Sequence, residues 1–399
     1  MLLSYKYRAD PTDTFRDEFY EHARIHADIF NKTLDTLDAA DDWISQYEMY
    51  NKLTKWKQNN SHESFKQVHS KAAQQTIGRI YRAIDGLNSL KQNGHAVGKI
   101  RYKPDTVHSI EYNQSGFDIT DEEVRLSKIG SVRYNKHRPI SGDIKGAVVK
   151  HNPSTNNWFV CIQAEVETTT EVPVEDIQSE NVIGIDVNIS NLFADSEGRK
   201  LESLFEYLEP EIERVKREHR DLSRKEVGSN NWKKQKARLT KAYENLVNKR
   251  DDVLHKLSRW YVDEYDLIAV EDLDSKEFSE SSHLGGLMRE QAWSRLTEFI
   301  EYKASQAGTR YCEVDPAYTT QDCSECGNRV EKSLSERTHS CGECGLELDR
   351  DVNSARTVLS NALDELGQGL SEFTPSETTA ASGDLISLST VTEQGSPRL

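Results

Sequence analysis

Four of the six cysteines form two Cys-x-x-Cys pairs, Cys323-Ser-Glu-Cys326 and Cys341-Gly-Glu-Cys344, which fourteen residues separate. Each pair turns two thiolates toward one point, and two pairs complete a tetrahedral site with four sulfur ligands. Gly327 and Gly345 follow the pairs directly, where glycine relaxes the turn. Four thiolates favour zinc over harder ions, and a closed site serves structure. Two redox-active pairs or an iron–sulfur centre are the rival interpretations, and the spacing favours a zinc ribbon.

Three carboxylates stand at the ends of separate predicted elements. Asp186 ends the apolar run NVIGID, Glu271 ends LIAVE, and Asp351 opens the last predicted helix. Each alone is explained as a turn residue or a helix cap. If the two strands are parallel neighbours, however, Asp186 and Glu271 lie side by side, and the helix can bring in Asp351. Three carboxylates suit Mg²⁺ or Mn²⁺, and two such ions about 3.5–4 Å apart can cleave a phosphodiester.

The hydrophobic periodicity predicts the strands and helices that surround these groups. Residues 1–9 alternate like a strand, and helical spacing follows over 15–37 and 68–87. Residues 144–150 and 158–166 read as two strands joined by a turn. This half of the chain is therefore predicted to be a β-rich unit with helices inserted after its first strand.

The second half reads as strand, hairpin, basic helices, strand, helix, strand, cysteine cluster and closing helix. This order is the skeleton of an α/β fold of the RNase H-like type. The last helix carries an apolar face from Val352 to Leu366 and stops at Gly367. Cys161 and Cys312 lie in strand-like runs and are expected to be buried thiols.

The net charge of −16 at pH 7 argues against a nucleic-acid partner. Acidity can also keep a protein soluble in very high salt, where charges are screened. Although the net charge of the whole chain is negative, residues 214–259 form a basic segment with fifteen Lys and Arg against six Asp and Glu. By itself this segment is best explained as a solvated helical hairpin.

The 399 residues suggest two or three domains. The N-terminal residues turn polar at once, unlike a signal peptide, and no apolar run approaches the roughly 20 residues that span a bilayer. We therefore expect a cytoplasmic protein with no membrane partner. Residues 368–399 are rich in Ser, Thr, Glu and Gly, a composition typical of a disordered tail.

Several segments together resemble the TnpB (OrfB) family of insertion-sequence-encoded, RNA-guided endonucleases, which is related to type V CRISPR effectors. They are GIDVNISNLFADSEG, YENLVNKRDDVLHKLSRWYV with DLIAVEDL, and AYTTQDCSECG with CGECGLELDRDVNSARTVL. RLSKIGSVRYNKHRPISGDIKGAVV fits the family in the N-terminal part. The resemblance covers roughly residues 1–366.

The resemblance implies a domain layout. A wedge-like β-barrel domain would comprise residues 1–12 and 96–170, with a helical recognition insertion over 13–95. A RuvC-like nuclease domain would comprise 171–315 and 346–367, interrupted by a zinc-ribbon module over 316–345 that binds target nucleic acid.

The resemblance also implies the roles of individual residues. By motif position, Asp186, Glu271 and Asp351 match the three catalytic acids that bind Mg²⁺ or Mn²⁺, while Asp349 is a nearby alternative that the residues alone do not exclude. The cysteines would bind structural Zn²⁺. Nucleic-acid contacts are expected from the basic helices: Lys233, Lys234, Lys236, Arg238, Lys249 and Arg250. The implied partners are a transposon-end guide RNA and target double-stranded DNA beside a short motif, with base pairing reading the target.

This sequence departs from the family pattern at two points. Asn188 stands where the family usually has glycine, two residues after Asp186; Asn tolerates left-handed backbone angles better than most residues. The acidic balance is unusual for an RNA-binding protein and suggests a host with high internal salt, where counterion release contributes less to binding.

Three functions compete at this point. The first is an RNA-guided, metal-dependent DNA endonuclease, and the retained carboxylates favour it. The second is a repressor-like, RNA-guided DNA-binding protein that does not cleave. The third is a transposase or transposase accessory protein, because the same acids can use a 3′-hydroxyl in place of water.

Overall fold

The computed structural model of the chain divides into two compact units, residues 1–166 and 167–399. It describes residues 1–186, 193–200, 204–272, 284–333 and 336–367. The predicted disordered tail and Asn188 lie outside these ranges. None of the helices described is both long enough and apolar enough to span a bilayer.

The first unit is built on a seven-stranded antiparallel sheet. Its order is β2-β6-β7-β1-β5-β4-β3, so that the N-terminal strand β1 pairs with β7 on one side and β5 on the other. The strands are β1 Leu2–Asp10, β2 Ser109–Asn113, β3 Phe117–Ile119, β4 Glu123–Leu126, β5 Gly130–Asn135, β6 Asp143–Asn152 and β7 Asn157–Glu165. The strands predicted at the start of the chain and around the 153 turn are thus present.

This sheet must curl, because its two edge strands are consecutive in sequence. Only residues 114–116 separate β2 from β3, and four Cα steps reach at most about 15 Å. Six strand spacings in a flat sheet would need about 29 Å. A hydrogen bond agrees with this curl, since the hydroxyl of Tyr112 in β2 donates at 2.8 Å to the carbonyl of Ser127, which directly follows β4, the neighbour of β3.

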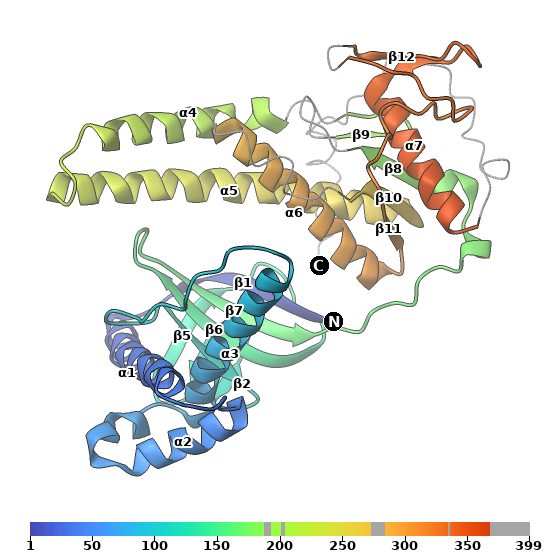
Figure 1. Cartoon of the computed structure of the whole chain (residues 1–399). Helices are drawn as coiled ribbons and strands as arrows, with labels where there is room; N and C mark the ends of the chain where they lie inside the picture. The colour runs from blue at the N-terminus through green and yellow to red at the C-terminus, as the bar shows by residue number, and fades with distance from the viewer. Residues whose placement is uncertain (187–192, 201–203, 273–283, 334–335, 368–399) are drawn as a thin grey trace. The chain divides into compact units, whose positions relative to one another are not determined.

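Three helices accompany this sheet (Figure 1). They are α1 Asp13–Asp38, α2 Gln46–Gln58 and α3 Ser70–Gln92, with a short 3₁₀ segment η1 Asn60–Lys66. Phe15, Phe19 and Ala23 of α1 pack with strand residues in one core, whereas Met49 and Leu53 of α2 belong to a smaller core among the helices. The first and third helices agree with the sequence prediction, and α2 was not predicted.

The second unit holds a four-stranded sheet of order β11-β10-β8-β9. Strands β8 Val182–Asp186, β10 Leu267–Glu271 and β11 Arg310–Val314 are parallel, and β9 Ala194–Asp195 runs antiparallel to β8. Every residue of β8 and β10 is buried. Parallel strands covered on both faces read as continuous apolar runs, which explains the two segments that end in carboxylates.

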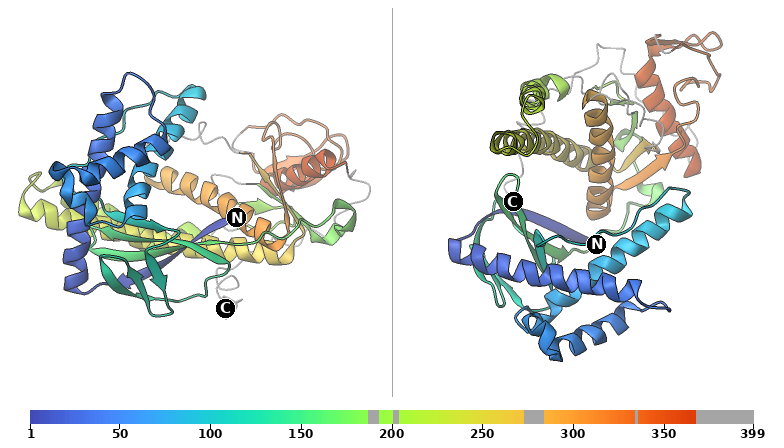
Figure 2. Two further views of the ribbon diagram at one scale, coloured as in Figure 1. Left: turned by 90° about the horizontal axis from the view of Figure 1, so that it is seen from below. Right: turned by 60° about the vertical axis from the view of Figure 1, so that its left-hand side comes forward.

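Helices cover both faces of this sheet (Figures 1 and 2). Ile183, Ile185 and Ile268 pack into a core with α4, α5 and α6, while Val182 and Leu267 pack with α7 on the other face. The helices are α4 Leu204–Ser223, α5 Asn230–Glu264, α6 Leu284–Ala307 and α7 Arg350–Glu365; the shorter elements are η2 Val174–Asp176, η3 Ser179–Asn181, β12 Thr338–Ser340 and β13 Glu347–Asp349.

Gly184 in β8 allows α7 to approach the sheet closely. A Cβ atom at this position would lie 2.2 Å from the carbonyl oxygen of Ala355 in α7. Any side chain would therefore push the helix away, so this glycine sets the distance between Asp186 and the helix that carries Asp351.

Candidate functional site

The four cysteines predicted to bind zinc come together in the structure. Their sulfur atoms lie within 4.8 Å of one another, and the Cys323–Cys344 and Cys326–Cys341 Sγ pairs are each 3.6 Å apart. A tetrahedron with Zn–S bonds of 2.3 Å has an edge of about 3.8 Å. The set therefore fits one zinc ion between the two pairs.

The two Cys-x-x-Cys turns have matching backbone geometry. The Gly327 amide donates to the Cys323 carbonyl at 2.8 Å, and the Gly345 amide to the Cys341 carbonyl at 3.0 Å. Both glycines have positive φ angles, 71° and 80°, which favour glycine. Backbone amides, chiefly that of Cys344, lower the pKa of the Cys341 thiol to about 6, which favours the thiolate that a metal needs.

Asp186 and Glu271 lie together at the carboxyl ends of two adjacent parallel strands. The register pairs Val270 with Ile185, so the next residue of each strand is a carboxylate at the same sheet edge. Their exposed fractions are only 3% and 6%. Burial raises the pKa of Glu271 to about 7, and hydrogen bonds with Thr319 and Asp186 offset only part of the rise.

Two buried carboxyl groups in contact cannot both be ionised without a positive partner. Near neutral pH the pair therefore holds either a proton or a cation. This donor set of hard oxygen atoms fits Mg²⁺ or Mn²⁺.

The first turn of α7 faces this pair. Ser354, which is fully buried, donates its hydroxyl to Asp186 Oδ1 at 3.0 Å. Asp351 precedes Ser354 by three residues and therefore shares its helix face; it is 4% exposed. The Arg350 guanidinium donates to Asp351 Oδ1 through Nε at 3.2 Å and Nη2 at 3.1 Å.

Asp349 serves a different purpose from Asp351. Its Oδ1 accepts from the Asp351 and Val352 amides at 3.0 and 3.3 Å as the N-cap of α7, and its Oδ2 pairs with Lys200 at 2.8 Å. Both oxygens are thus engaged, so the geometry favours Asp351 over Asp349 as the third carboxylate.

The carboxylates are not as tightly gathered as the cysteines. Within the described ranges, the four cysteines form the only group of three or more potential ligands whose atoms all lie within 4.8 Å. The structure thus places Asp186 and Glu271 in contact, with Asp351 on the adjoining helix face and paired with Arg350.

Two polar side chains connect the zinc ribbon to the carboxylates, and neither role was predicted. Thr319 donates its hydroxyl to Glu271 Oε1 at 2.5 Å. Asn353 of α7 accepts from the Ser324 amide at 3.0 Å and donates to the Asp322 carbonyl at 2.8 Å. No sequence signal identifies Thr319. Ser354, which binds Asp186, could have been found from the helical periodicity that starts at Asp351.

The six predicted nucleic-acid contacts fall into two groups on α5. Lys233, Lys234, Lys236, Arg238 and Lys249 are exposed. Lys249 pairs with Glu211, and Arg250, which is 4% exposed, pairs with Asp251 at 2.8 Å. Arg250 therefore serves a protein contact and has almost no surface to offer a ligand.

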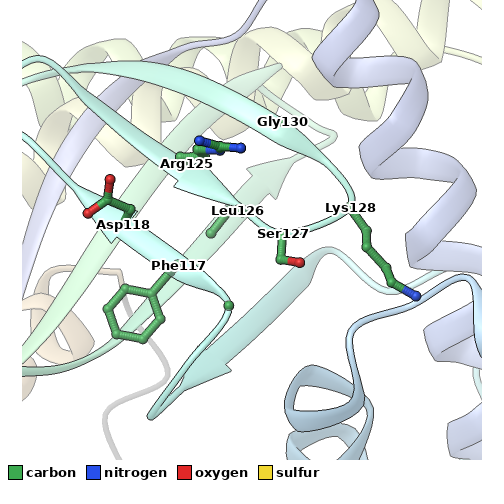
Figure 3. A pocket seen from close by; sticks show the side chains of 8 residues that line it. Phe117, Asp118, Arg125, Leu126, Ser127, Lys128 and Gly130 are labelled. Atoms are coloured by element: carbon green, nitrogen blue, oxygen red, sulfur yellow. The ribbon is translucent and has the colours of Figure 1, made fainter.

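The first unit has a shallow hollow of about 460 Å³ on its sheet (Figure 3). β3, β4 and the following turn line it, with Phe117, Asp118, Arg125 and Lys128 among the lining residues. It brings together no set of groups suited to catalysis, so the carboxylate pair remains the site with the clearest chemistry.

Comparisons with known proteins match this arrangement. The family model described as "Probable transposase" matches residues 162–282, and "Cas12f1-like, TNB domain" matches 293–358. "Putative RNA-guided DNA endonuclease InsQ" of Escherichia coli (strain K12) is 27% identical over 380 residues, covering 90% of this chain and 92% of InsQ. A Streptomyces pristinaespiralis protein named "Putative RNA-guided DNA endonuclease" is 27% identical over 371 residues, which cover 90% of this chain and 89% of that protein.

These matches confirm the resemblance to the TnpB (OrfB) family.

A solved structure shares the fold of this chain. The structure of the mini-RNA-guided endonuclease CRISPR-Cas phi3 superposes with a TM-score of 0.51 at 10% identity, covering 91% of this chain and 92% of that one. The two matched family models together reach from β7 to α7 and include Asp186, Glu271, the four cysteines and Asp351.

Proposed function

We propose that this protein is an RNA-guided, divalent-metal-dependent DNA endonuclease of a transposable element, hydrolysing phosphodiester bonds at a RuvC-type site. One observation carries the proposal: Asp186 and Glu271 are buried in contact at the ends of parallel strands, beside the helix that bears Asp351. The names of the relatives, which describe RNA-guided DNA endonucleases, support the same activity.

The architecture supports a domain assignment within this proposal. The curled sheet of the first unit would be the wedge-like barrel, with α1 to α3 as the helical recognition insertion. The sheet β11-β10-β8-β9 between helices would be an RNase H-like nuclease domain. Residues 316–345 would be a zinc-ribbon module that contacts target nucleic acid.

Asp186, Glu271 and Asp351 would hold the catalytic Mg²⁺ or Mn²⁺. When bound, such ions activate a water molecule and stabilise the leaving oxygen of the phosphodiester. The protein's part is to hold the three carboxylates in place: Ser354 orients Asp186 through its hydroxyl.

Glu271 and Asp351 are also held from neighbouring segments. Thr319 fixes Glu271 from the zinc-ribbon side, and Arg350 contacts Asp351. Burial of the carboxylates excludes bulk water, which strengthens their electrostatic interaction with a cation.

The exposed basic residues of α5 supply a surface for a nucleic-acid backbone. Lys233, Lys234, Lys236, Arg238 and Lys249 would contact phosphates of the guide RNA or of the target DNA, and such contacts weaken steeply as salt rises. Arg250 is left out of this proposal because it is buried. The guide would be a transposon-end RNA that pairs with target double-stranded DNA.

A plasmid assay tests the function. The protein is purified with co-expressed RNA, which is sequenced, and the complex is mixed with Mg²⁺ in high potassium salt. The substrate plasmid carries the matching target beside a randomised flank. We expect double-strand cleavage next to one short flanking motif, and no cleavage by Asp186→Ala.

Glu313→Ala is the matched control, because Glu313 is an exposed acid on the neighbouring strand β11. It should cleave like the wild type. Cleavage that persists in Asp186→Ala would refute the assigned site. Specific binding by the wild type without cleavage would leave the repressor-like function in its place.

A further inference from the structure

Tyr318 and Arg329 form an exposed aromatic–guanidinium pair at the base of the zinc ribbon. The Arg329 guanidinium carbon lies 3.5 Å from the centroid of the Tyr318 ring. Tyr318 is 52% exposed, so a large part of its ring surface is free of protein contact within the described residues. None of the functions assigned above uses this pair.

The backbone at Tyr318 has a conformation that stability alone would not select. Its φ angle is +68°, a left-handed value that is an outlier for a bulky residue and natural for glycine. Such strained residues cluster at functional sites. A bulky side chain held at this backbone angle, with its ring in solvent, indicates that the ring itself is used.

The tyrosine is not needed to place the arginine. Arg329 already makes two hydrogen bonds to the Asp322 carboxylate, from Nε at 2.7 Å and from Nη2 at 3.1 Å. The guanidinium is therefore fixed by Asp322, and it in turn holds the tyrosine ring. The pair is an exposed aromatic surface backed by a guanidinium group whose charge is paired with Asp322.

Both ends of this surface are tied to the carboxylate site. Tyr318 directly precedes Thr319, whose hydroxyl is bonded to Glu271, and adjacent Cα atoms lie about 3.8 Å apart. At the other end, the Asp322 carbonyl accepts from Asn353 of α7, two residues after Asp351. The surface is thus anchored next to both elements that would hold the catalytic ions.

We propose that Tyr318, backed by Arg329, stacks on a base of the single-stranded DNA whose backbone enters the carboxylate site, and so positions the scissile phosphate. This inference rests on the proposed function. Aromatic rings that bind single strands stack on any base, because every base has a π-face, and arginine adds a cation–π contribution. Tyr318 is accordingly a positioning residue that sets where the strand lies.

Fluorescence of 2-aminopurine tests the stacking without any need for cleavage. Single-stranded DNA oligonucleotides carry the probe at successive positions and are mixed with the RNA-bound protein in an Asp186→Ala background. We expect quenching at one position, lost in Tyr318→Ala and kept in Tyr318→Phe. Affinity for the oligonucleotide should fall roughly 5- to 100-fold in Tyr318→Ala, the range seen for single stacked bases.

Tyr207→Ala is the matched control, since Tyr207 is also an exposed tyrosine of the second unit beside a lysine, Lys249. It should leave the quenching unchanged. Equal quenching in Tyr318→Ala and the wild type would overturn the inference. Quenching of 2-aminopurine in an RNA oligonucleotide of the same sequence, without quenching in the DNA oligonucleotide, would also overturn it. Zinc content is measured for every variant. If Tyr318→Ala loses zinc, the experiment is repeated with Tyr318→Leu. Loss of quenching in Tyr318→Leu supports stacking by the aromatic ring, and retained quenching overturns it.

Cleavage kinetics separate this inference from the proposed function. In the otherwise wild-type protein, Tyr318→Ala should raise KM for the DNA strand more than it lowers kcat, and spread the cut over neighbouring phosphates. A wild-type complex that quenches the probe but never cleaves would contradict the proposed function and leave the stacking intact. Unchanged KM and unchanged cut position in Tyr318→Ala would overturn the stacking and leave the nuclease intact.

Discussion

The two candidate metal sites of the second unit are assembled in opposite ways. The cysteine site draws its ligands from 22 consecutive residues, Cys323 to Cys344, in two turns of matching geometry. The carboxylate site draws its ligands from β8, β10 and α7, which span 166 residues from Asp186 to Asp351. The first therefore depends on local turns, whereas the second exists only when the sheet and its helices are complete.

The two sites are nevertheless connected. Thr319 reaches from the ribbon to Glu271, and Asn353 reaches from α7 to the first cysteine turn. The locally built cysteine site thus supports a carboxylate site whose ligands are far apart in sequence.

Removal of a zinc ligand should have the largest effect. Cys341→Ser removes one of the four sulfur ligands and should lower the zinc content from about one ion per chain to none. The module should then unfold, because zinc binding supplies about 10–16 kcal/mol of folding free energy in such modules. Cleavage should be abolished, since Thr319 would no longer be held against Glu271 and Asn353 would lose its partners Ser324 and Asp322. Metal analysis and limited proteolysis around residues 316–350 measure the two effects; full cleavage by a zinc-free variant would break the connection that we describe.

Loss of one carboxylate should abolish activity without affecting the zinc. Glu271→Gln keeps the shape of the side chain and removes a charge that the cation needs. Cleavage should fall on the order of 10⁴- to 10⁶-fold, as for single members of other catalytic sets, while metal analysis still finds one zinc. Cleavage within tenfold of the wild type would show that Glu271 is not part of the site.

A substitution at Asn353 should break the connection between the cysteine site and the carboxylate site. Asn353→Ala removes the hydrogen bonds to Ser324 and Asp322 but leaves every proposed ligand in place. Residues that orient metal ligands typically contribute 10- to 100-fold, so cleavage should fall by that factor with zinc retained. Thr357→Val is the control, because Thr357 makes a longer 3.4 Å contact to the same Asp322 carbonyl. Equal activity of Asn353→Ala and the wild type would mean that the sites are independent.

The smallest effect concerns pH and stability. The pKa of Glu271 is about 7 when folded and near its ordinary value of 4.5 when unfolded. Between these values the folded protein binds more protons, so without Mg²⁺ its stability should fall as pH rises from 4.5 to 7, by up to about 3 kcal/mol. Urea unfolding of the zinc-loaded protein measures this slope, which Glu271→Gln should lack. An equal slope in both proteins would assign the pH dependence to other groups.

The sequence predicts best what is encoded locally. The spacing of the cysteines and their glycines predicted the four-sulfur group, and the apolar runs before Asp186 and Glu271 predicted the buried parallel strands. Helix α2 was missed because it is mostly polar and buries only Met49 and Leu53, which gives too weak a periodicity.

Partners that depend on tertiary contacts could not be predicted. Arg250 has the same chemistry as its basic neighbours on α5, and only the position of its helix face in the fold leaves it 4% exposed. The choice between Asp349 and Asp351 likewise rests on which carboxylate caps α7, a matter of backbone geometry at one turn. Thr319 and Ser354 are ordinary polar residues until the fold places them against carboxylates.

Mn²⁺ binding by the zinc-loaded protein shows directly whether the three distant carboxylates form one cation site. Electron paramagnetic resonance titration counts the bound Mn²⁺. We predict that wild type and Asp349→Asn bind Mn²⁺ alike, since asparagine also caps helices well, and that Asp186→Asn, Glu271→Gln and Asp351→Asn each lose it. Unchanged binding in Asp351→Asn together with lost binding in Asp349→Asn would contradict the account.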